Sequence, residues 1–194
     1  MVIAGHNGAG KTTFYTQRLG PVIGGMVDAH INADDIELAM SHALRRGGLS
    51  KEELEDLAGA EATRLRKQYL AQEISFSFET VFSDPAMDKA LFMEEARRRG
   101  YLVVLLAIGL KSIEKSKERV AARHARGGHN IRAEKLEQRY GRVLRNFALG
   151  ASAASLAIFL DNSEDCDEDE AGAYWDIAFM EDGSLVCKVE SPPA

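Results

Sequence analysis

The segment Gly5-His6-Asn7-Gly8-Ala9-Gly10-Lys11-Thr12 constrains the fold more than any other, because it fits the spacing G-x-x-x-x-G-K-[S/T] of a phosphate-binding loop. The apolar run 1–4 before it predicts a strand, and residues 12–19 after it predict a helix. Glycines let the backbone approach a phosphate chain closely, and a helix N-terminus carries a partial positive charge. The segment therefore predicts binding of a nucleoside triphosphate.

The motif assigns a role to each of its last two residues, Lys11 and Thr12. Lys11 can reach the β- and γ-phosphates, and the hydroxyl of Thr12 can take a place on Mg²⁺. We expect the nucleotide to contact the whole loop, which comprises Gly5, His6, Asn7, Gly8, Ala9, Gly10, Lys11, Thr12 and Thr13.

Composition narrows the class of protein. The chain has 194 residues and is 45% hydrophobic, which suits one α/β domain over 1–194. The sequence contains no apolar run of 18 residues and no signal-type segment, and its two cysteines form no C-x-x-C pair, so we expect a cytoplasmic protein away from the membrane. A net charge of −6 argues against nucleic acid as the main ligand.

Carboxylates follow two of the expected strands. The run 26–31 reads as a strand that ends in Asn-Ala-Asp-Asp before a helix from Ile36, and 74–78 reads as a strand that ends in Glu79-Thr80. Ligands collect beyond the carboxyl ends of strands in open α/β sheets. One of Asp34 and Asp35 could be a general base or hold metal-bound water while the other caps the helix, and we favour Asp34 as the base. Glu79 could accept hydrogen bonds from substrate hydroxyls, although an exposed strand-end residue remains the alternative.

A third strand, expected at 101–108, ends without an aspartate, so it lacks a Walker B carboxylate. Metal binding would then fall to Thr12, the phosphates and water, with Asp34 as a further candidate. Earlier in the chain, Ser50 opens a capping box for a helix to about 72, and Asp84-Pro85 predicts the start of a helix that runs to about 99.

Basic residues are concentrated in two expected helices, 112–126 and 131–149, joined by Gly127-Gly128. Residues 111–145 hold eleven Lys or Arg against four Asp or Glu. Arg119, Arg123 and Arg126 recur on one helical face. We interpret 111–149 as a lid whose arginines neutralise a transferring phosphoryl group and whose His129 forms hydrogen bonds, although any single arginine could simply be solvated.

The C-terminal part continues the sheet. Residues 155–160 predict a strand, 161–172 an acidic surface loop, and 173–190 a β-hairpin around Asp182-Gly183. The complete pattern predicts a three-layer P-loop NTPase/kinase fold of the α/β class, with a mainly parallel sheet, an Arg-rich helical lid and a C-terminal β-hairpin.

The ordered series G-H-N-G-A-G-K-T-T, I-N-A-D-D-I, F-E-T, R-V-A-A-R-H-A-R-G-G-H-N-I, R-Y and L-D-N-S resembles the zeta-toxin family of P-loop kinases over about residues 2–163. The resemblance implies transfer of the γ-phosphate of ATP to the amino-sugar 3′-hydroxyl of UDP-N-acetylglucosamine. It assigns the general base to Asp34, sugar contact to Glu79 and catalysis to Lys11, Arg119 and Arg123. It further places Arg126 at the nucleotide, and Thr80, His129 and Arg139 on the substrate side. An antitoxin protein becomes a candidate partner.

Other functions remain open at this point. The same scaffold could phosphorylate another small molecule or a nucleotide. It could also be a P-loop ATPase, or a nucleotide-binding module regulated by a protein partner. The lid-like arginines and the missing Walker B carboxylate argue against the ATPase.

Overall fold

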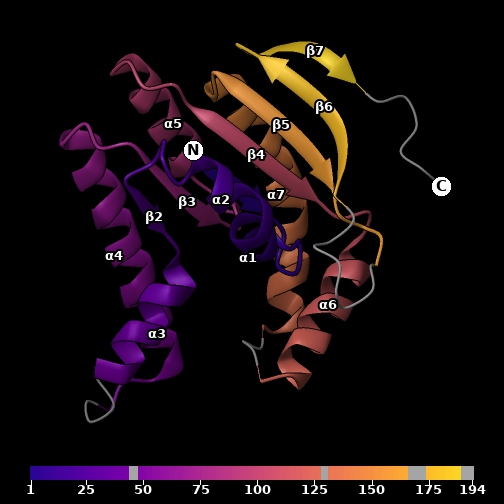
Figure 1. Cartoon of the computed structure of the whole chain (residues 1–194). Coiled ribbons are helices and arrows are strands. Elements are labelled where there is room, and N and C mark those ends of the chain that lie inside the picture. The colour runs from indigo at the N-terminus through magenta and orange to yellow at the C-terminus, as the bar shows by residue number, and fades with distance from the viewer. Residues whose placement is uncertain (44–47, 128–130, 166–173, 189–194) are drawn as a thin grey trace. The chain divides into compact units, whose positions relative to one another are not determined.

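The computed structural model describes residues 1–43, 48–127, 131–165 and 174–188 (Figure 1). The chain divides into two compact units, and each is described here by itself. Unit 1 comprises Met1–Pro21 and Thr80–Ala194, and unit 2 comprises Val22–Glu79. The single domain predicted over 1–194 stays a prediction.

Unit 1 is built on five strands in the order β1-β4-β5-β6-β7. β1 pairs with β4 and β4 with β5 in parallel, whereas β5 with β6 and β6 with β7 are antiparallel. The strands are β1 (Val2–Gly5), β4 (Val104–Gly109), β5 (Leu156–Asp161), β6 (Trp175–Glu181) and β7 (Ser184–Lys188). The α/β fold with a mainly parallel sheet and a C-terminal hairpin is thereby confirmed.

Both faces of β1 and of the middle of β4 are buried, as a parallel sheet between helical layers requires. On one face, Leu106 and Ile108 pack with Phe14 and Leu19 of the segment that follows the phosphate-binding loop. That segment consists of α1 (Lys11–Phe14), a π-helical turn η1 (Tyr15–Leu19) and α2 (Gly20–Ile23). On the opposite face, Leu105 lies against Gly150 of α7 (Ala133–Ala153).

The described part of unit 1 also contains the helices α5 (Asp88–Arg98) and α6 (Ile113–Ala125). The C-terminal half of α7 is part of the core, because Val143, Phe147 and Ala151 are buried there. The segment 111–149, predicted to be a lid, therefore includes part of the core. A lid that moves as a whole would not contain such a buried segment.

Unit 2 contains two parallel strands, β2 (Ala29–Ile31) and β3 (Phe76–Thr80, whose last residue belongs to unit 1), and two helices, α3 (Ala33–Ala43) and α4 (Lys51–Ala71). The predicted capping box is present, since the Ser50 hydroxyl accepts from the Glu53 N–H and the Glu53 carboxylate accepts from the Ser50 N–H. β3 is buried along its whole length.

Two predicted helix starts are wrong. α3 begins at Ala33 rather than Ile36, because the Asn32 side chain accepts from the N–H of Asp34 at 3.0 Å and caps the helix in place of Asp35. α5 begins three residues later than Asp84-Pro85 suggests. Met87, the residue immediately before α5, has a positive φ of 59°. The residues after Pro85 therefore form a turn, and the helix begins only after it.

Candidate active site

The phosphate-binding loop joins β1 to α1, as predicted. Lys11 is the first residue of α1, and its ammonium group donates to the carbonyls of Gly5 and His6, both at 3.1 Å. The Lys11 side chain therefore folds back against the loop that would bind the phosphates. Gly8 and Gly10 have φ of 79° and 83°, which glycine adopts at little cost.

Close packing explains why the first glycine of the motif is needed. A Cβ on Gly5 would lie 2.6 Å from the carbonyl oxygen of Ile108 on the neighbouring strand. A methyl group cannot occupy that position without moving the backbone of β1 or β4.

Helices α6 and α7 hold one side of the loop. The Ser116 hydroxyl donates to the Asn7 carbonyl at 2.7 Å, and Arg139 donates to the Asn7 side-chain oxygen at 3.3 Å. A Cβ on Gly8 would meet the Cβ of Arg119 at 3.1 Å, so α6 passes directly against the loop. Arg139, assigned above to the substrate side, thus reaches the nucleotide loop.

His6, the second residue of the loop, is buried, with 2% of its surface exposed. Its ring stacks on Tyr140 at 4.4 Å and meets Phe147 edge-on at 6.1 Å, both on α7. Its Nε2 has no hydrogen-bond partner. Burial, aided by the positive charge of Lys11, lowers the pKa of His6 to about 4, so the ring is neutral at physiological pH. His6 is therefore a packing residue, and its predicted contact with nucleotide stays a prediction.

The other side of the loop is held from the C-terminal part of the chain. The Asn162 amide donates to the Ala9 carbonyl at 3.0 Å, and the Tyr174 hydroxyl donates to the Gly10 carbonyl at 2.7 Å. The Tyr174 ring also meets Phe14 edge-on at 4.8 Å and lies beneath the Arg18 guanidinium at 5.1 Å.

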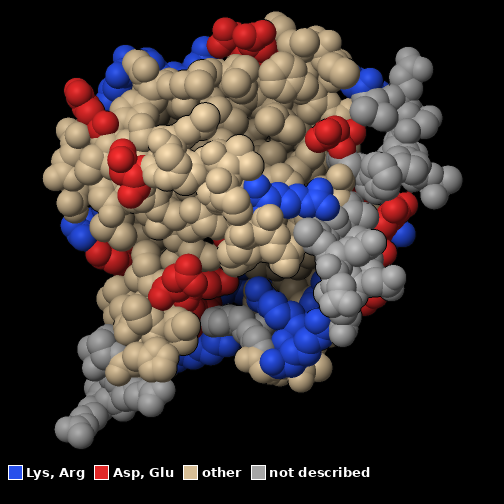
Figure 2. Space-filling model, viewed as in Figure 1, with Lys and Arg blue, Asp and Glu red and all other residues tan. Residues whose placement is uncertain are grey.

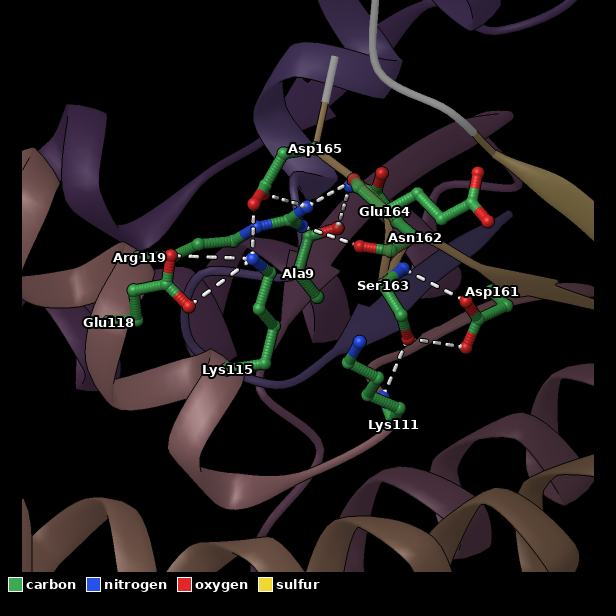
Figure 3. A network of polar contacts seen from close by, with 10 residues as sticks. All are labelled: Ala9, Lys111, Lys115, Glu118, Arg119, Asp161, Asn162, Ser163, Glu164 and Asp165. Atoms are coloured by element: carbon green, nitrogen blue, oxygen red, sulfur yellow. Dashed lines mark hydrogen bonds and ion pairs between the residues drawn. The ribbon is translucent and has the colours of Figure 1, made fainter. Parts of the chain in front are cut away.

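Arg119 belongs to a polar network that ties α6 to the segment after β5 (Figure 3). Its guanidinium donates to the carbonyls of Asn162 at 2.5 Å and Glu164 at 2.6 Å, and to the Asp165 carboxylate at 3.1 Å. The buried Lys115 also binds the Asp165 carboxylate. Lys115 and Arg119 together hold the pKa of the Asp165 carboxyl below its usual value. Arg119 thus has a structural role here, and its catalytic assignment stays a prediction.

The other predicted lid residues lie farther along. Arg123 on α6 and Arg126 at its C-cap are exposed, and Figure 2 shows Lys and Arg side chains gathered over the region of α6. His129 lies outside the described residues, so its predicted role stays untested. Thr12 and Thr13, at the start of α1, are exposed as well.

In unit 2, the acceptor-side candidates sit near strand ends. Asp34 and Asp35 both lie exposed in the first turn of α3. Glu79, on β3, is 9% exposed, and its carboxylate lies 3.5 Å from Nε2 of His30 on β2, whose Nδ1 lies 2.8 Å from the Ser77 hydroxyl. The predicted exposed alternative for Glu79 is thereby excluded.

Thr80, the last residue of β3, is assigned to unit 1. Its hydroxyl accepts from the N–H of Phe82 at 3.0 Å, which occupies one side of that oxygen. Contact with substrate stays a prediction for Asp34, Glu79 and Thr80 alike.

Sequence reasoning missed several residues that shape the loop, namely Ser116, Asn162 and Tyr174. Asn162 carries a weak signal, since a polar residue directly after a buried strand is often engaged. Tyr174 carries none, because 164 residues separate it from Gly10 and only the sheet brings the two together.

A strand, a glycine loop, a helix and a lysine turned into the loop define a P-loop nucleotide-binding protein. A model of the zeta toxin family matches residues 1–162, and the chain belongs to that family of P-loop kinases. Residues 163–194 lie beyond the matched region. No curated protein sequence matches the chain.

Solved structures support the same fold. A chain of the AvrRxo1-ORF1:AvrRxo1-ORF2 complex, solved with sulphate ions, matches at 18% identity and a TM-score of 0.63 over 96% of this chain, which spans 60% of the matched chain. A chain of the PezAT chromosomal toxin–antitoxin system of Streptococcus pneumoniae matches at 17% identity and a TM-score of 0.61. The match covers 90% of this chain and 69% of the PezAT chain. A protein of Chloroflexus aurantiacus matches at 19% identity and a TM-score of 0.52. The match covers 73% of this chain and 74% of that protein.

Two negative findings concern the described residues. No helix among them is both long enough and apolar enough to cross a bilayer. They also contain no group of three or more His, Cys, Asp or Glu side chains that could bind a metal.

Proposed function

We propose that this zeta-toxin family kinase transfers the γ-phosphate of Mg·ATP to the amino-sugar 3′-hydroxyl of UDP-N-acetylglucosamine, with Asp34 as general base. The observation that carries the nucleotide half is the position of Lys11, whose ammonium group lies 3.1 Å from two loop carbonyls at the head of α1. The acceptor half rests on the family and on the segment Asn-Ala-Asp-Asp after β2.

The loop fits a triphosphate by the chemistry of its donors. Lys11 would exchange its two carbonyl partners for phosphate oxygens, which are charged and therefore bind an ammonium more strongly. The N–H groups at the start of a helix point outward along its axis, so those of α1 would donate to the same anion. Neutralising this charge before transfer is the main contribution that the loop can make to the rate.

Magnesium fits only as a partner of the nucleotide. Thr12, exposed at the first turn of α1, offers one hydroxyl oxygen, and the remaining ligands would come from phosphates and water. When bound, the ion would supply charge neutralisation between the β- and γ-phosphates. Omission of magnesium should therefore abolish transfer.

On the acceptor side, Asp34 is the candidate for taking the proton from the attacking hydroxyl. It is exposed at the N-terminus of α3, so its carboxylate is accessible to solvent and to a substrate. Glu79 would accept hydrogen bonds from the sugar. His30, beside Glu79, would help to hold that carboxylate in place.

The test measures phosphorylated products by mass spectrometry after incubation with Mg·ATP and either UDP-N-acetylglucosamine or a metabolite extract. Lys11→Ala should abolish ATP turnover. Asp34→Asn should lower transfer ~10²-fold or more while ATP binding persists. Asp35→Asn is the matched control, because this neighbouring carboxylate lies in the same helical turn and should keep transfer nearly intact.

Each outcome decides one part of the proposal. Full transfer by Asp34→Asn would refute the base assignment. Phosphorylation of another metabolite, with UDP-N-acetylglucosamine left unchanged, would refute the sugar-nucleotide acceptor and keep the kinase. ATP hydrolysis that no acceptor diverts would favour an ATPase.

An antitoxin partner is part of the same proposal. PezAT is described as a toxin–antitoxin system, and the AvrRxo1 structure is a complex of two proteins. Expression of this chain should arrest growth of a bacterium that makes peptidoglycan, and Lys11→Ala should not. Equal arrest by both forms would show that toxicity does not depend on phosphoryl transfer.

A further inference from the structure

Two consecutive carbonyls of the phosphate-binding loop are held by side chains from the C-terminal part of the chain. The Ala9 carbonyl accepts from Asn162 and the Gly10 carbonyl from Tyr174. In a planar trans peptide the C=O and the following N–H point in opposite directions. Fixing these carbonyls therefore fixes the directions of the Gly10 and Lys11 N–H groups, which face the opposite side.

Those two N–H groups are among the donors that a P-loop offers to phosphate. The Gly10 carbonyl also accepts from the N–H of Phe14 at 2.8 Å, the first hydrogen bond of α1. Tyr174 thus bonds to the peptide at which the loop becomes a helix. A hydrogen bond to a carbonyl also polarises its peptide, which makes the attached N–H a better donor.

Strand pairing brings the two side chains to this place. β5 and β6 run antiparallel with Asp161 opposite Trp175, so Asn162 and Tyr174 are the next pair of positions. The far end of β6 is also fixed, since the Asp182 carboxylate binds Arg97 at 2.8 Å and the Asp182 N–H donates to the Ser155 carbonyl at 2.9 Å. Tyr174 is therefore placed by a strand that is anchored at both ends.

Tyr174 and Asn162 approach the backbone so closely that only glycine fits at position 10. A Cβ on Gly10 would lie 2.5 Å from the Tyr174 hydroxyl and 2.6 Å from the Asn162 amide nitrogen. The Tyr174 ring is held independently by Phe14 and Arg18. The hydroxyl therefore sits directly over the loop backbone.

We propose that Tyr174, which lies beyond the family-matched region, is a positioning residue of the phosphate-binding loop. Its hydroxyl holds the Gly10 peptide so that the Lys11 N–H faces the phosphates, and Asn162 does the same for the preceding peptide. The inference rests on the proposed binding of ATP by this loop. It assigns to the C-terminal hairpin a part in nucleotide affinity.

The test compares Tyr174→Phe with wild type by calorimetric titration of ATP and of inorganic tripolyphosphate, which can contact the loop but has no nucleoside. The variant keeps the ring contacts and loses only the hydroxyl. We expect both ligands to bind about fivefold more weakly, the equivalent of a net hydrogen bond of about 1 kcal/mol. The KM for the acceptor should stay near the wild-type value, and the free energy of unfolding should fall by no more than the loss of one hydrogen bond, about 1 kcal/mol.

Tyr101→Phe is the matched control. Tyr101 precedes β4, whereas the loop follows the carboxyl end of β1, and these strands are parallel, so the control lies at the opposite edge of the sheet. It should leave both affinities unchanged. If Tyr174→Phe does not fold, Asn162→Ala should show the same paired loss.

Three results would overturn the inference. Unchanged affinities in Tyr174→Phe would show that the hydroxyl does not act on the loop. Loss of ATP affinity alone would assign Tyr174 to the nucleoside instead. Failure of the wild type to bind either ligand would overturn the proposed function together with this inference, whereas the first two results leave the kinase proposal standing.

Discussion

Acidification should destabilise the protein through His6, the buried histidine of the phosphate-binding loop. Its pKa is about 4 in the folded state, against 6.5 in an unfolded chain. Below pH 6.5 the unfolded state therefore binds a proton that the folded state rejects, and stability falls as the pH drops. The full difference is about 3 kcal/mol, at 1.36 kcal/mol per pKa unit, and about 2 kcal/mol of it should be lost between pH 7 and pH 5.

The assay is urea unfolding followed by circular dichroism at pH 7, 6 and 5. His6→Gln removes the titrating group, so its stability should fall by about 2 kcal/mol less than that of wild type between pH 7 and 5. His6→Phe, which keeps a ring on Tyr140, serves if the glutamine variant does not fold. His124→Gln, which removes an exposed histidine on α6, is the matched control for the loss of a histidine. Parallel curves for wild type and the His6 variants would refute the argument.

Two further predictions concern the core behind the loop. Gly150→Ala should lower the free energy of unfolding by about 1–3 kcal/mol, because the new Cβ would lie 2.7 Å from the Phe82 ring. Gly141→Ala on the same helix meets nothing within 4 Å and should gain up to about 1 kcal/mol, so equal effects in urea unfolding would contradict the packing argument. Asn146→Ala should cost about 1–3 kcal/mol, since its amide donates at 2.9 Å to the buried Phe82 carbonyl, and an unchanged midpoint would disprove that.

Local signals predicted much of the fold. The strand, loop and helix around Gly5 to Thr12 follow from apolar runs and glycine spacing, and the turn at Asp182-Gly183 follows from its residue types. Ser50 and Glu53 form the capping box that their spacing predicts. These features depend on residues a few positions apart, which is why the sequence alone reveals them.

The misses arise where several residues can satisfy the same local rule or where distant ones meet. Asn32 and Asp35 are equally good helix caps, and the sequence does not decide between them. The arginine spacing on α6 is correct, yet Arg119 binds carbonyls of the segment after β5, which helical periodicity cannot show. The burial of Glu79 beside His30 likewise depends on the pairing of β2 with β3.

The bond between Tyr174 and Gly10 has a consequence for synthesis of the chain. A ribosome adds about 5–20 residues per second, so the 164 residues between the two delay their contact by roughly 10–30 s. During that interval the loop lacks the hydroxyl that orients the Lys11 amide. On the proposal made for Tyr174, the last roughly fivefold of nucleotide affinity would then arise only near the end of translation.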